Sequence, residues 1–282
     1  MANYFKLKLE DKPKDITSFS SLGKTKREFR GEKVGHAGTL DKFAEGLMII
    51  MIGSATKLNP VFSSFSKKYI ATIEFGDETS TLDPEGEVVV SAPVPTFDAL
   101  KAAVESFIGP QMQVPPLYSA LHVDGKRAYE MARSGKEVEM EARPIEIYSI
   151  ELLSYDGKVA RVECHVSKGT YIRSLARDIA IKCGSRAHLI ELKRTQVGPF
   201  TLEDVNLTTR ELLDKTDLFS TIHLDSKFKK EIDNGWVDKR AILSDSDKSK
   251  EFSYLYFGDE FYGIGEKSGK LKVIMRGSDG NL

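Results

Sequence analysis

The chain has 282 residues, a formal net charge of −1, 40% apolar residues and 29% charged residues. This composition is ordinary for a globular protein, and the length suffices for one large domain plus a small one. The longest apolar stretch, residues 46–52, is too short to span a bilayer, which argues against a membrane-spanning protein.

No signal peptide is expected at the N-terminus. The two cysteines, Cys164 and Cys183, lack the spacing of a disulfide framework or of a zinc site. We therefore expect a protein of the reducing cytoplasm, with no bound metal.

The first third of the chain alternates between strand patterns and one helical pattern. Residues 4–9 alternate apolar and polar side chains, which predicts a half-buried strand. Residues 17–29 have helical spacing, and Gly31 is expected to end that helix. The apolar run 46–52 fits either a buried strand or the start of a buried helix, and residues 67–75 alternate again.

The middle of the chain carries two more helical patterns separated by prolines. Thr96 can cap a helix that runs to Phe107. Residues 114–118 must be extended, because proline restricts both itself and the residue before it. Residues 126–134 have helical spacing, with Gly135 as the expected C-terminal cap.

A hairpin and a helix are expected next. Residues 145–153 and 158–166 are strand-like, and the turn between them contains Asp156-Gly157, a strong hairpin signal. Thr170 is then expected to cap a helix over residues 171–182.

The residue pattern of the chain changes near its C-terminal end. Thr208 and Glu211 form the pattern of a capping box for one more short helix. Beyond about Asp225, polar stretches separate short strand-like pieces at residues 252–257, 260–264 and 271–275. We therefore predict two domains, residues 1–225 and a small β-rich domain over residues 226–282.

The segment Lys-Val-Gly-His-Ala-Gly-Thr-Leu-Asp, residues 33–41, is the most informative motif. Glycine adopts backbone angles closed to other residues and lets a ligand approach the main chain. The segment can therefore form a tight loop that presents the carboxylate of Asp41. On these residues alone, an ordinary turn in which Asp41 caps the following segment is an equal alternative.

Basic residues gather around this motif even though the net charge is close to zero. Several stand just before it, namely Lys24, Lys26, Arg27, Arg30 and Lys33. Others recur beside turns, namely Lys67-Lys68, Lys126-Arg127, Arg133, Lys168, Arg173, Arg177 and Lys193-Arg194. A single cluster is usually only a solvated face, but several near one loop favour a surface that binds RNA.

Five ordered blocks carry a specific resemblance. They are residues 35–41 with Ala44 and Gly46-Leu47; Lys68-Tyr69 with Ala71 and Gly76; residues 114–120 with Gly125, Tyr129, Ala132 and Arg133; residues 167–173 with Leu175 and Asp178; and residues 192–200. Together they resemble the TruB-type tRNA pseudouridine synthases. Lys12-Pro13 is a weaker match, and residues 263–266 are similar to the small C-terminal domain of that family.

The chain departs from the family pattern at several positions. Lys42 follows Asp41, where the family usually has proline, and Phe43 and Glu45 replace smaller residues. His122 stands where lysine is common, and Asp15 replaces a glycine of the Lys-Pro block.

The resemblance implies an α+β fold: a mixed, largely antiparallel central sheet flanked by helices, with a small C-terminal β-rich, PUA-like domain. It also implies an isomerase of tRNA processing, which converts uridine to pseudouridine at position 55 of the T-loop. Because this reaction needs no redox change and no net hydrolysis, no cofactor and no metal are expected. The expected partner is the tRNA T stem-loop, with no membrane and no obligate protein partner.

Residue by residue, the resemblance assigns Asp41 as the carboxylate that attacks C1′ or C6 or stabilises a charged intermediate. Arg173 would pair with Asp41, and Tyr69 would stack on the uracil extruded from the loop. His36 would occupy the stacking space that the uracil leaves. The other residues expected to contact RNA are Gly38, Thr39, Lys12, Lys168, Tyr171 and Arg194.

Three other functions compete with this interpretation. Gly23-Lys24-Thr25 resembles the end of a phosphate-binding P-loop, but that motif requires glycine at the position of Ser18. Asp41 and Glu45 might form a glycosidase pair, but no aromatic cluster surrounds them. A non-catalytic protein that binds or folds tRNA through the same surface is the serious alternative. The combination of Asp41, Tyr69 and Arg173 favours an enzyme.

Overall fold

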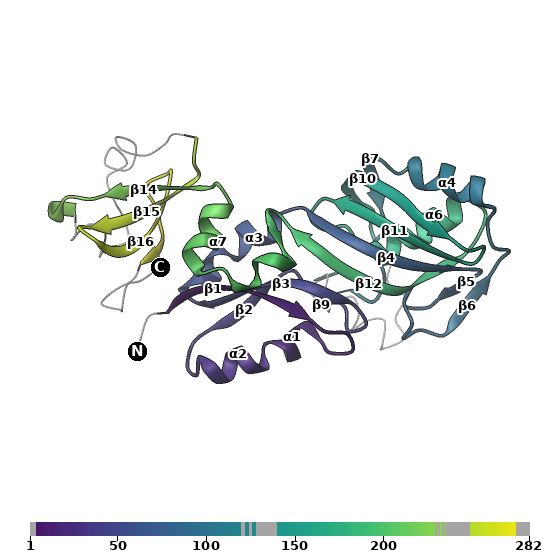
Figure 1. Ribbon diagram of the computed structural model, residues 1–282, viewed down its shortest axis with the longest axis horizontal. Coiled ribbons are helices and arrows are strands. Elements are labelled where there is room, and N and C mark those ends of the chain that lie inside the picture. The colour runs from purple at the N-terminus through teal and green to yellow at the C-terminus, as the bar shows by residue number, and fades with distance from the viewer. Residues whose placement is uncertain are drawn as a thin grey trace.

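A computed structural model describes residues 4–119, 122–123, 126–127, 140–228, 230, 232, 234 and 249–274. A nine-stranded sheet dominates this structure, with the strand order β1-β3-β12-β4-β11-β10-β7, while β2 pairs with β3 and β13 with β12 (Figure 1). Its strands are β1 (Phe5–Lys12), β2 (Val34–Ala37), β3 (Glu45–Gly53), β4 (Lys67–Phe75), β7 (Gly109–Gln113), β10 (Arg143–Tyr155), β11 (Val159–Val166), β12 (Ala187–Val197) and β13 (Phe200–Thr201). The pairing of β12 with β3 is parallel, and the other pairings in this sheet are antiparallel.

Helices flank the sheet, which confirms the predicted α+β class with a mixed, largely antiparallel sheet. They are α1 (Ser18–Ser21), α2 (Gly23–Glu28), α3 (Asn59–Ser64), α4 (Phe97–Glu105), α6 (Ile172–Lys182) and α7 (Thr209–Lys215), with the 3-10 helices η1 (Ser54–Leu58), η2 (Leu202–Asn206) and η3 (Ser226–Phe228). No helix in the part of the chain that the structure describes is long and apolar enough to cross a membrane.

The apolar run at residues 46–52 is a strand, β3, which settles the choice that its pattern left open. Residues 46–53 are all buried, because β3 lies inside the sheet with β1 on one side and β12 on the other. Leu47, Ile49 and Met51 point into one apolar core, and the residues between them point into a second. A strand covered on both faces needs apolar side chains at every position, which explains the continuous run.

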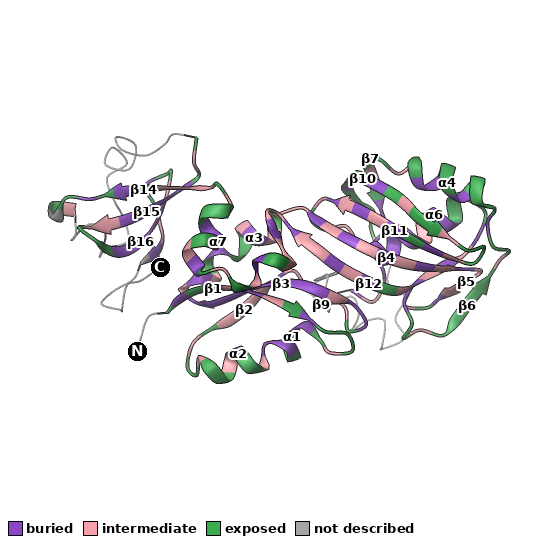
Figure 2. Ribbon diagram, in the orientation of Figure 1, coloured by how far each residue is buried: buried purple, intermediate pink, exposed green. Residues whose placement is uncertain are grey.

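The second of these cores, which contains Met48 and Ile50, lies between the sheet and helices α4 and α6. Leu100 and Val104 of α4 and Leu175 and Ile179 of α6 pack there against buried residues of β4, β10, β11 and β12. Figure 2 shows these buried positions as stripes along the central strands. The helix α6 is thereby fixed under the sheet, so its first turn has a defined position.

Several predictions from local patterns are confirmed. The strand predicted over residues 67–75 is β4, with buried and half-buried residues alternating along it. The predicted hairpin is β10 and β11, which pair antiparallel. Thr96 caps α4, and Thr208 with Glu211 forms the capping box of α7.

Two helix predictions need correction. The pattern over residues 17–29 gives two short helices, α1 and α2, separated at the buried residue Leu22. The N-cap of α6 is Tyr171 and not Thr170, and no side chain of its own caps it. Instead, the Gln113 side chain accepts a hydrogen bond from the Tyr171 N–H at 2.9 Å and donates one to its carbonyl at 3.1 Å. Gln113 of the strand β7 thus bonds to the N-cap residue of α6, where we expected the side chain of Thr170 to cap the helix.

The helix expected over residues 126–134 is wrong at its first two positions. Lys126–Arg127 form the strand β9, which pairs with β8 (His122–Val123). Residues 128–134 and Gly135 lie outside the described residues, as do Ala120 and Gly125 of the third sequence block.

A separate four-stranded sheet forms the C-terminal part, in the order β14-β15-β16-β17. Its strands are β14 (Phe219–His223), β15 (Phe252–Phe257), β16 (Glu260–Glu266) and β17 (Leu271–Ile274). Phe252, Tyr254 and Phe261 of this sheet share a core with Phe5 and Leu7 of β1. The strand β14 precedes residue 226, so the sheet recruits a strand from before the predicted domain limit. The division into residues 1–225 and 226–282 stays a prediction.

Candidate active site

A cavity of about 770 Å³ opens where the sequence blocks meet. Residues 38–43, which comprise the end of the motif at residues 33–41 and the two residues after it, are called the glycine loop and form one wall. Residues 80–87, between β5 (Asp77–Thr79) and β6 (Val88–Ser91), form much of another. The remaining lining comes from the start of β4, from β12, from Tyr118 and Ser119, and from the connection between β11 and α6. Segments that are far apart in sequence therefore surround one space of a size suited to a small organic group.

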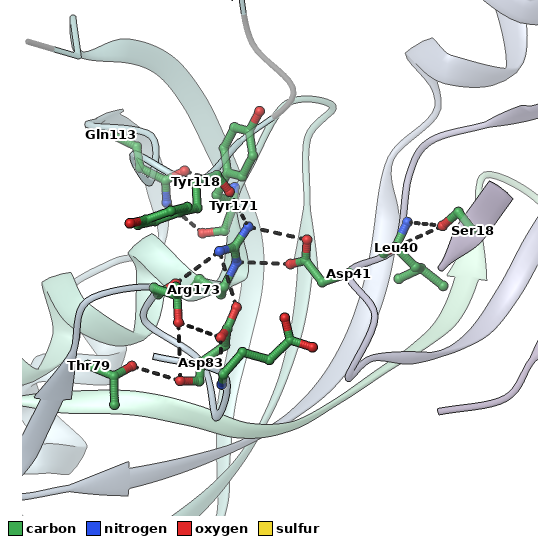
Figure 3. A network of polar contacts seen from close by, with 11 residues as sticks. Ser18, Leu40, Asp41, Thr79, Asp83, Gln113, Tyr118, Tyr171 and Arg173 are labelled. Carbon is green, nitrogen blue, oxygen red and sulfur yellow. Dashed lines mark hydrogen bonds and ion pairs between the residues drawn. The ribbon is translucent and has the colours of Figure 1, made fainter. Parts of the chain in front are cut away.

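Asp41 and Arg173 meet at this cavity, as the sequence predicts (Figure 3). The Arg173 Nε lies 2.9 Å from one carboxylate oxygen of Asp41, and its Nη2 donates to the other at 3.2 Å. This fork is the bidentate geometry that an arginine makes with a carboxylate. The Arg173 side chain is only 5% exposed, whereas that of Asp41 is 37% exposed and faces the cavity. The buried Arg173 thus binds the Asp41 carboxylate from the protein interior, while another side of the carboxylate is open to the cavity.

A second carboxylate, Asp83, holds the other side of the same guanidinium. The Arg173 Nη1 lies 3.3 Å from an Asp83 oxygen and donates to the Thr81 carbonyl at 2.9 Å, while Nη2 donates to the Tyr118 carbonyl at 2.9 Å. Asp83 is buried and accepts hydrogen bonds from the Thr81 hydroxyl and the Glu85 N–H. Every guanidinium nitrogen has an oxygen partner, so Arg173 has one orientation.

The sequence prediction missed Asp83. It lies in the acidic stretch 77–87, which resembles a solvated surface turn. The available signal was the Asp83-Pro84-Glu85-Gly86 turn, whose residues are typical of a fixed backbone. Leu82 has a positive φ of 61°, which is unusual for a residue other than glycine. The unusual backbone places Asp83 toward Arg173.

Opposing effects act on the pKa of Asp41. Burial raises this pKa, and the nearby carboxylates of Asp83 and Glu85 raise it further. The charge and the hydrogen bonds of Arg173 lower it. The pKa of Asp41 is raised overall, and Arg173 is the group that limits this rise and favours the ionised carboxylate.

Tyr69 lines the cavity from β4, directly opposite Arg194 of β12. Its side chain is 8% exposed. Burial raises the pKa of the Tyr69 phenol, although Arg194 opposes the shift. The phenol is therefore uncharged at neutral pH, with its ring available at the cavity wall.

Lys12 and Arg194, which the sequence predicts to contact RNA, are both buried and bond to the chain's own carbonyls, although Arg194 also lines the cavity. Arg194 is 1% exposed and donates to the carbonyls of Leu47 and Gly38 at 2.7 and 3.1 Å. Lys12 is fully buried and donates to the carbonyls of Pro13, Ile16 and Lys42. A buried cation requires acceptors, and the chain's own carbonyls provide them. Both residues brace the glycine loop.

The other residues predicted to bind RNA have different positions. Gly38, Thr39 and Tyr171 line the cavity, whereas Lys168 and His36 do not. Gly38 has a φ of 84°, and a Cβ there would lie 3.3 Å from the Arg194 guanidinium, so the site requires glycine. His36 is half-buried in β2, and burial, Arg194 and Lys26 together lower its pKa.

Lys67 is a cavity residue that the sequence indicated only as part of a basic pair. Its ammonium donates to the carbonyls of Ser63 and Phe65 at 2.9 and 2.5 Å. Burial, with the nearby charges of Arg194 and Lys168, lowers the pKa of Lys67 to about 8. The period of the strand puts Lys67 on the same face as Tyr69 and Ala71, which is buried, and puts the half-buried Lys68 on the other face.

Two other charged residues of the loop region form ion pairs, one at the cavity and one outside it. Lys42, which stands in the usual place of proline, forms an ion pair with Glu85 across the cavity at 3.4 Å. Glu45, the other carboxylate considered for glycosidase chemistry, pairs with Lys193 at 3.4 Å and does not line the cavity. Among the residues that the structure describes, no group of three or more His, Cys, Asp and Glu could hold a metal ion.

Comparisons with known proteins identify the family of the chain. Residues 26–172 match the model of the TruB family pseudouridylate synthase N-terminal domain, and residues 173–230 match that of the tRNA pseudouridylate synthase B C-terminal domain. The tRNA pseudouridine synthase B of Borreliella burgdorferi (strain ZS7) is 42% identical over 233 residues, which is 82% of each chain. That of Borreliella afzelii (strain PKo) is 38% identical and covers 97% of this chain and 95% of its own.

Solved structures share the fold at lower identity. The chain matches a crystal structure of a Cbf5-Nop10-Gar1 complex with a TM-score of 0.60 and 23% identity, over 93% of this chain and 78% of that chain. The family predicted from the sequence blocks is confirmed, and with it the prediction of an enzyme. The chain belongs to the TruB family of pseudouridylate synthases.

Proposed function

We propose that this enzyme converts uridine to pseudouridine in the T-loop of tRNA, at position 55, with Asp41 as the reacting carboxylate. The observation that carries the proposal is the Asp41 carboxylate, open to the cavity on one side and held bidentately by the buried Arg173 on the other. Mere RNA binding requires no such anion. The names of the relatives support tRNA as the substrate.

The reaction breaks the bond between uracil N1 and C1′, turns the base, and forms a new bond from C5 to C1′. The C5 proton is lost and N1 gains a proton, so no oxidant and no external group are consumed. An ionised Asp41 can attack C1′, attack C6, or stabilise the positive charge that develops at the sugar. All three routes require the anion that Arg173 maintains.

The uridine must leave its loop to reach Asp41, at a cost of a few kcal/mol for unstacking. In our proposal the uracil stacks on the Tyr69 ring at the cavity wall, and His36 fills the space that the base leaves in the RNA. Gly38, Thr39 and Tyr171 also line the cavity. The braces from Lys12 and Arg194 keep the loop in place during this exchange, because both bond to its carbonyls.

Arg173 has two partners for a physical reason. Its charge offsets the burial of Asp41, and Asp83 fixes the guanidinium from the opposite side. A catalytic group that is already oriented needs no rearrangement in the transition state. We assign Asp83 as a positioning residue, which acts through Arg173.

We propose tRNA alone as the partner, with no obligate second protein, and the cytoplasm as the site of action. Cys164 and Cys183 are both free, which suits a reducing compartment. We also propose that residues 1–225 carry the reaction and that the C-terminal sheet forms a separate, PUA-like unit.

The test is release of tritium from C5-labelled uridine in a tRNA transcript, measured in a single turnover. Asp41→Asn keeps the size of the side chain and removes its charge, so release should fall to background while the RNA dissociation constant changes little. Glu45→Gln is the matched control, because Glu45 is a nearby carboxylate outside the cavity.

A transcript with cytidine at position 55 tests the target site, since release should vanish there. Near-native release by Asp41→Asn would overturn the proposed active site. Undiminished tritium release from the cytidine transcript would show that position 55 is not the target. It would not contradict the proposed reaction.

A further inference from the structure

The most exposed large apolar side chain among the described residues is Phe19, at 71%. Its backbone belongs to α1, which is fixed by the Thr17 side chain accepting from the Ser20 N–H at 3.0 Å. The hydroxyl of Ser18 also bonds to both the N–H and the carbonyl of Leu40 at 2.8 Å. An aromatic ring that a fixed backbone exposes to solvent can mark a site where the protein binds a partner.

A positively charged side chain lies over the Phe19 ring. The ammonium of Lys26, on α2, lies 3.5 Å from the centre of the ring. The pair joins an aromatic surface to a positive charge. Because the ring remains 71% exposed, most of its surface is open to a further partner.

This pair lies beside the glycine loop. Ser18, the neighbour of Phe19, bonds to Leu40, and Leu40 directly precedes Asp41, as Figure 3 shows. Lys26 is close enough to His36 for its charge to lower the pKa of the histidine. An RNA whose target base enters the cavity would therefore pass near Phe19.

The charges around the pair identify the chemistry of the partner. Lys24, Arg27, Arg30 and Lys33 are all exposed on or just after α2. Aromatic rings among lysines and arginines suit an unpaired nucleotide, whose base stacks on the ring and whose phosphates meet the cations. An apolar protein partner would not require this concentration of positive charge.

We propose that Phe19 and Lys26 form a second base-binding platform outside the cavity, on which an unpaired base of the RNA stacks while the target uridine is held at Asp41. The platform rests on the proposed function, since it binds the same RNA. The platform would contribute to affinity and to the choice of a loop over a duplex, because paired bases are not free to stack on a side chain.

The test measures the dissociation constant of a T stem-loop RNA at fixed salt for Phe19→Ala, Phe19→Tyr and the wild type. Loss of one base stack should weaken binding about tenfold for Phe19→Ala, and tyrosine should restore it. Phe97→Ala is the matched control, since Phe97 is 52% exposed on α4, at the other end of the main sheet (Figure 1). Its binding should equal that of the wild type.

A scan of abasic sites through the RNA loop locates the stacked base. One abasic position outside the target should weaken binding to the wild type about tenfold and leave binding to Phe19→Ala unchanged, because the stack is already absent. Thermal unfolding of Phe19→Ala should match the wild type, which excludes a folding defect.

Unchanged affinity of Phe19→Ala would overturn the platform and leave a protein partner as the explanation of the exposed ring. Equal sensitivity of wild type and variant to every abasic site would also overturn it. A wild type that neither binds the stem-loop nor releases tritium would instead overturn the proposed function.

Discussion

Two sets of positive side chains near the cavity look alike in sequence and differ in their exposure to solvent and in their bonding partners. The bracing cations, Lys12, Arg173 and Arg194, are at most 5% exposed and bond to carbonyls or carboxylates of the chain itself. The outer cations, Lys24, Arg27, Arg30 and Lys33, are exposed to solvent. The first set shapes the site and the second set is available to RNA. The residue type alone therefore says nothing about which of the two tasks a cation performs.

Among the cations, the largest expected effect is on Arg173. Arg173→Lys keeps the charge but cannot hold Asp41 bidentately or contact Asp83 at the same time. The single-turnover rate should fall at least about a hundredfold, as for loss of one oriented electrostatic partner. Arg177→Lys is the control in the same helix, because Arg177 pairs with Asp178 and does not line the cavity. A near-native rate for Arg173→Lys would show that the fork is not required.

Arg194→Met tests whether the bracing cations act on the fold. The substitution leaves the carbonyls of Leu47 and Gly38 without their partner inside the protein. Stability should fall by about 3 kcal/mol, which lowers the Tm by roughly 6–12 °C. Arg27→Met, in the outer set, should leave the Tm unchanged. Equal Tm values for the two variants would remove the distinction between the two sets.

Lys67 predicts a pH dependence of stability. Its pKa is about 8 in the folded protein, below the ordinary value of 10.5, so between these pH values the unfolded chain binds more protons. The free energy of unfolding should therefore rise with pH in that window, by on the order of 2 kcal/mol, and be constant below it. Lys67→Met should abolish this rise. The measurement is denaturant unfolding of both proteins from pH 7 to pH 10, and parallel curves would contradict the assignment.

The smallest expected effects belong to single outer cations. Arg30→Ala should weaken RNA binding only modestly and should lower the slope of log affinity against log salt by about one. Lys101→Ala, on α4, is the control, since this exposed lysine is remote from the glycine loop. A salt slope that stays constant for every outer cation would exclude them from the RNA interface.

Much of the fold and of the candidate site follows from local patterns. Alternation located β4, and Asp156-Gly157 located the turn between β10 and β11. Both predictions succeed because strand period and turn chemistry are properties of neighbouring residues. The five blocks singled out Asp41, Tyr69 and Arg173 as catalytic residues; that role stays a prediction, and all three side chains line one cavity. The family and the enzyme class came from the same blocks.

Only the tertiary structure decided the surroundings of these residues. Asp83 lies 90 positions from Arg173 in sequence, and the carbonyl of Leu47 lies 147 positions from Arg194. Whether a charged side chain is solvated or buried depends on which distant segments cover it, and the free energy of a buried charge depends on the acceptors they bring. The pattern of the chain identified the carboxylate that we propose to react, and the packing of the sheet determined which cation holds it.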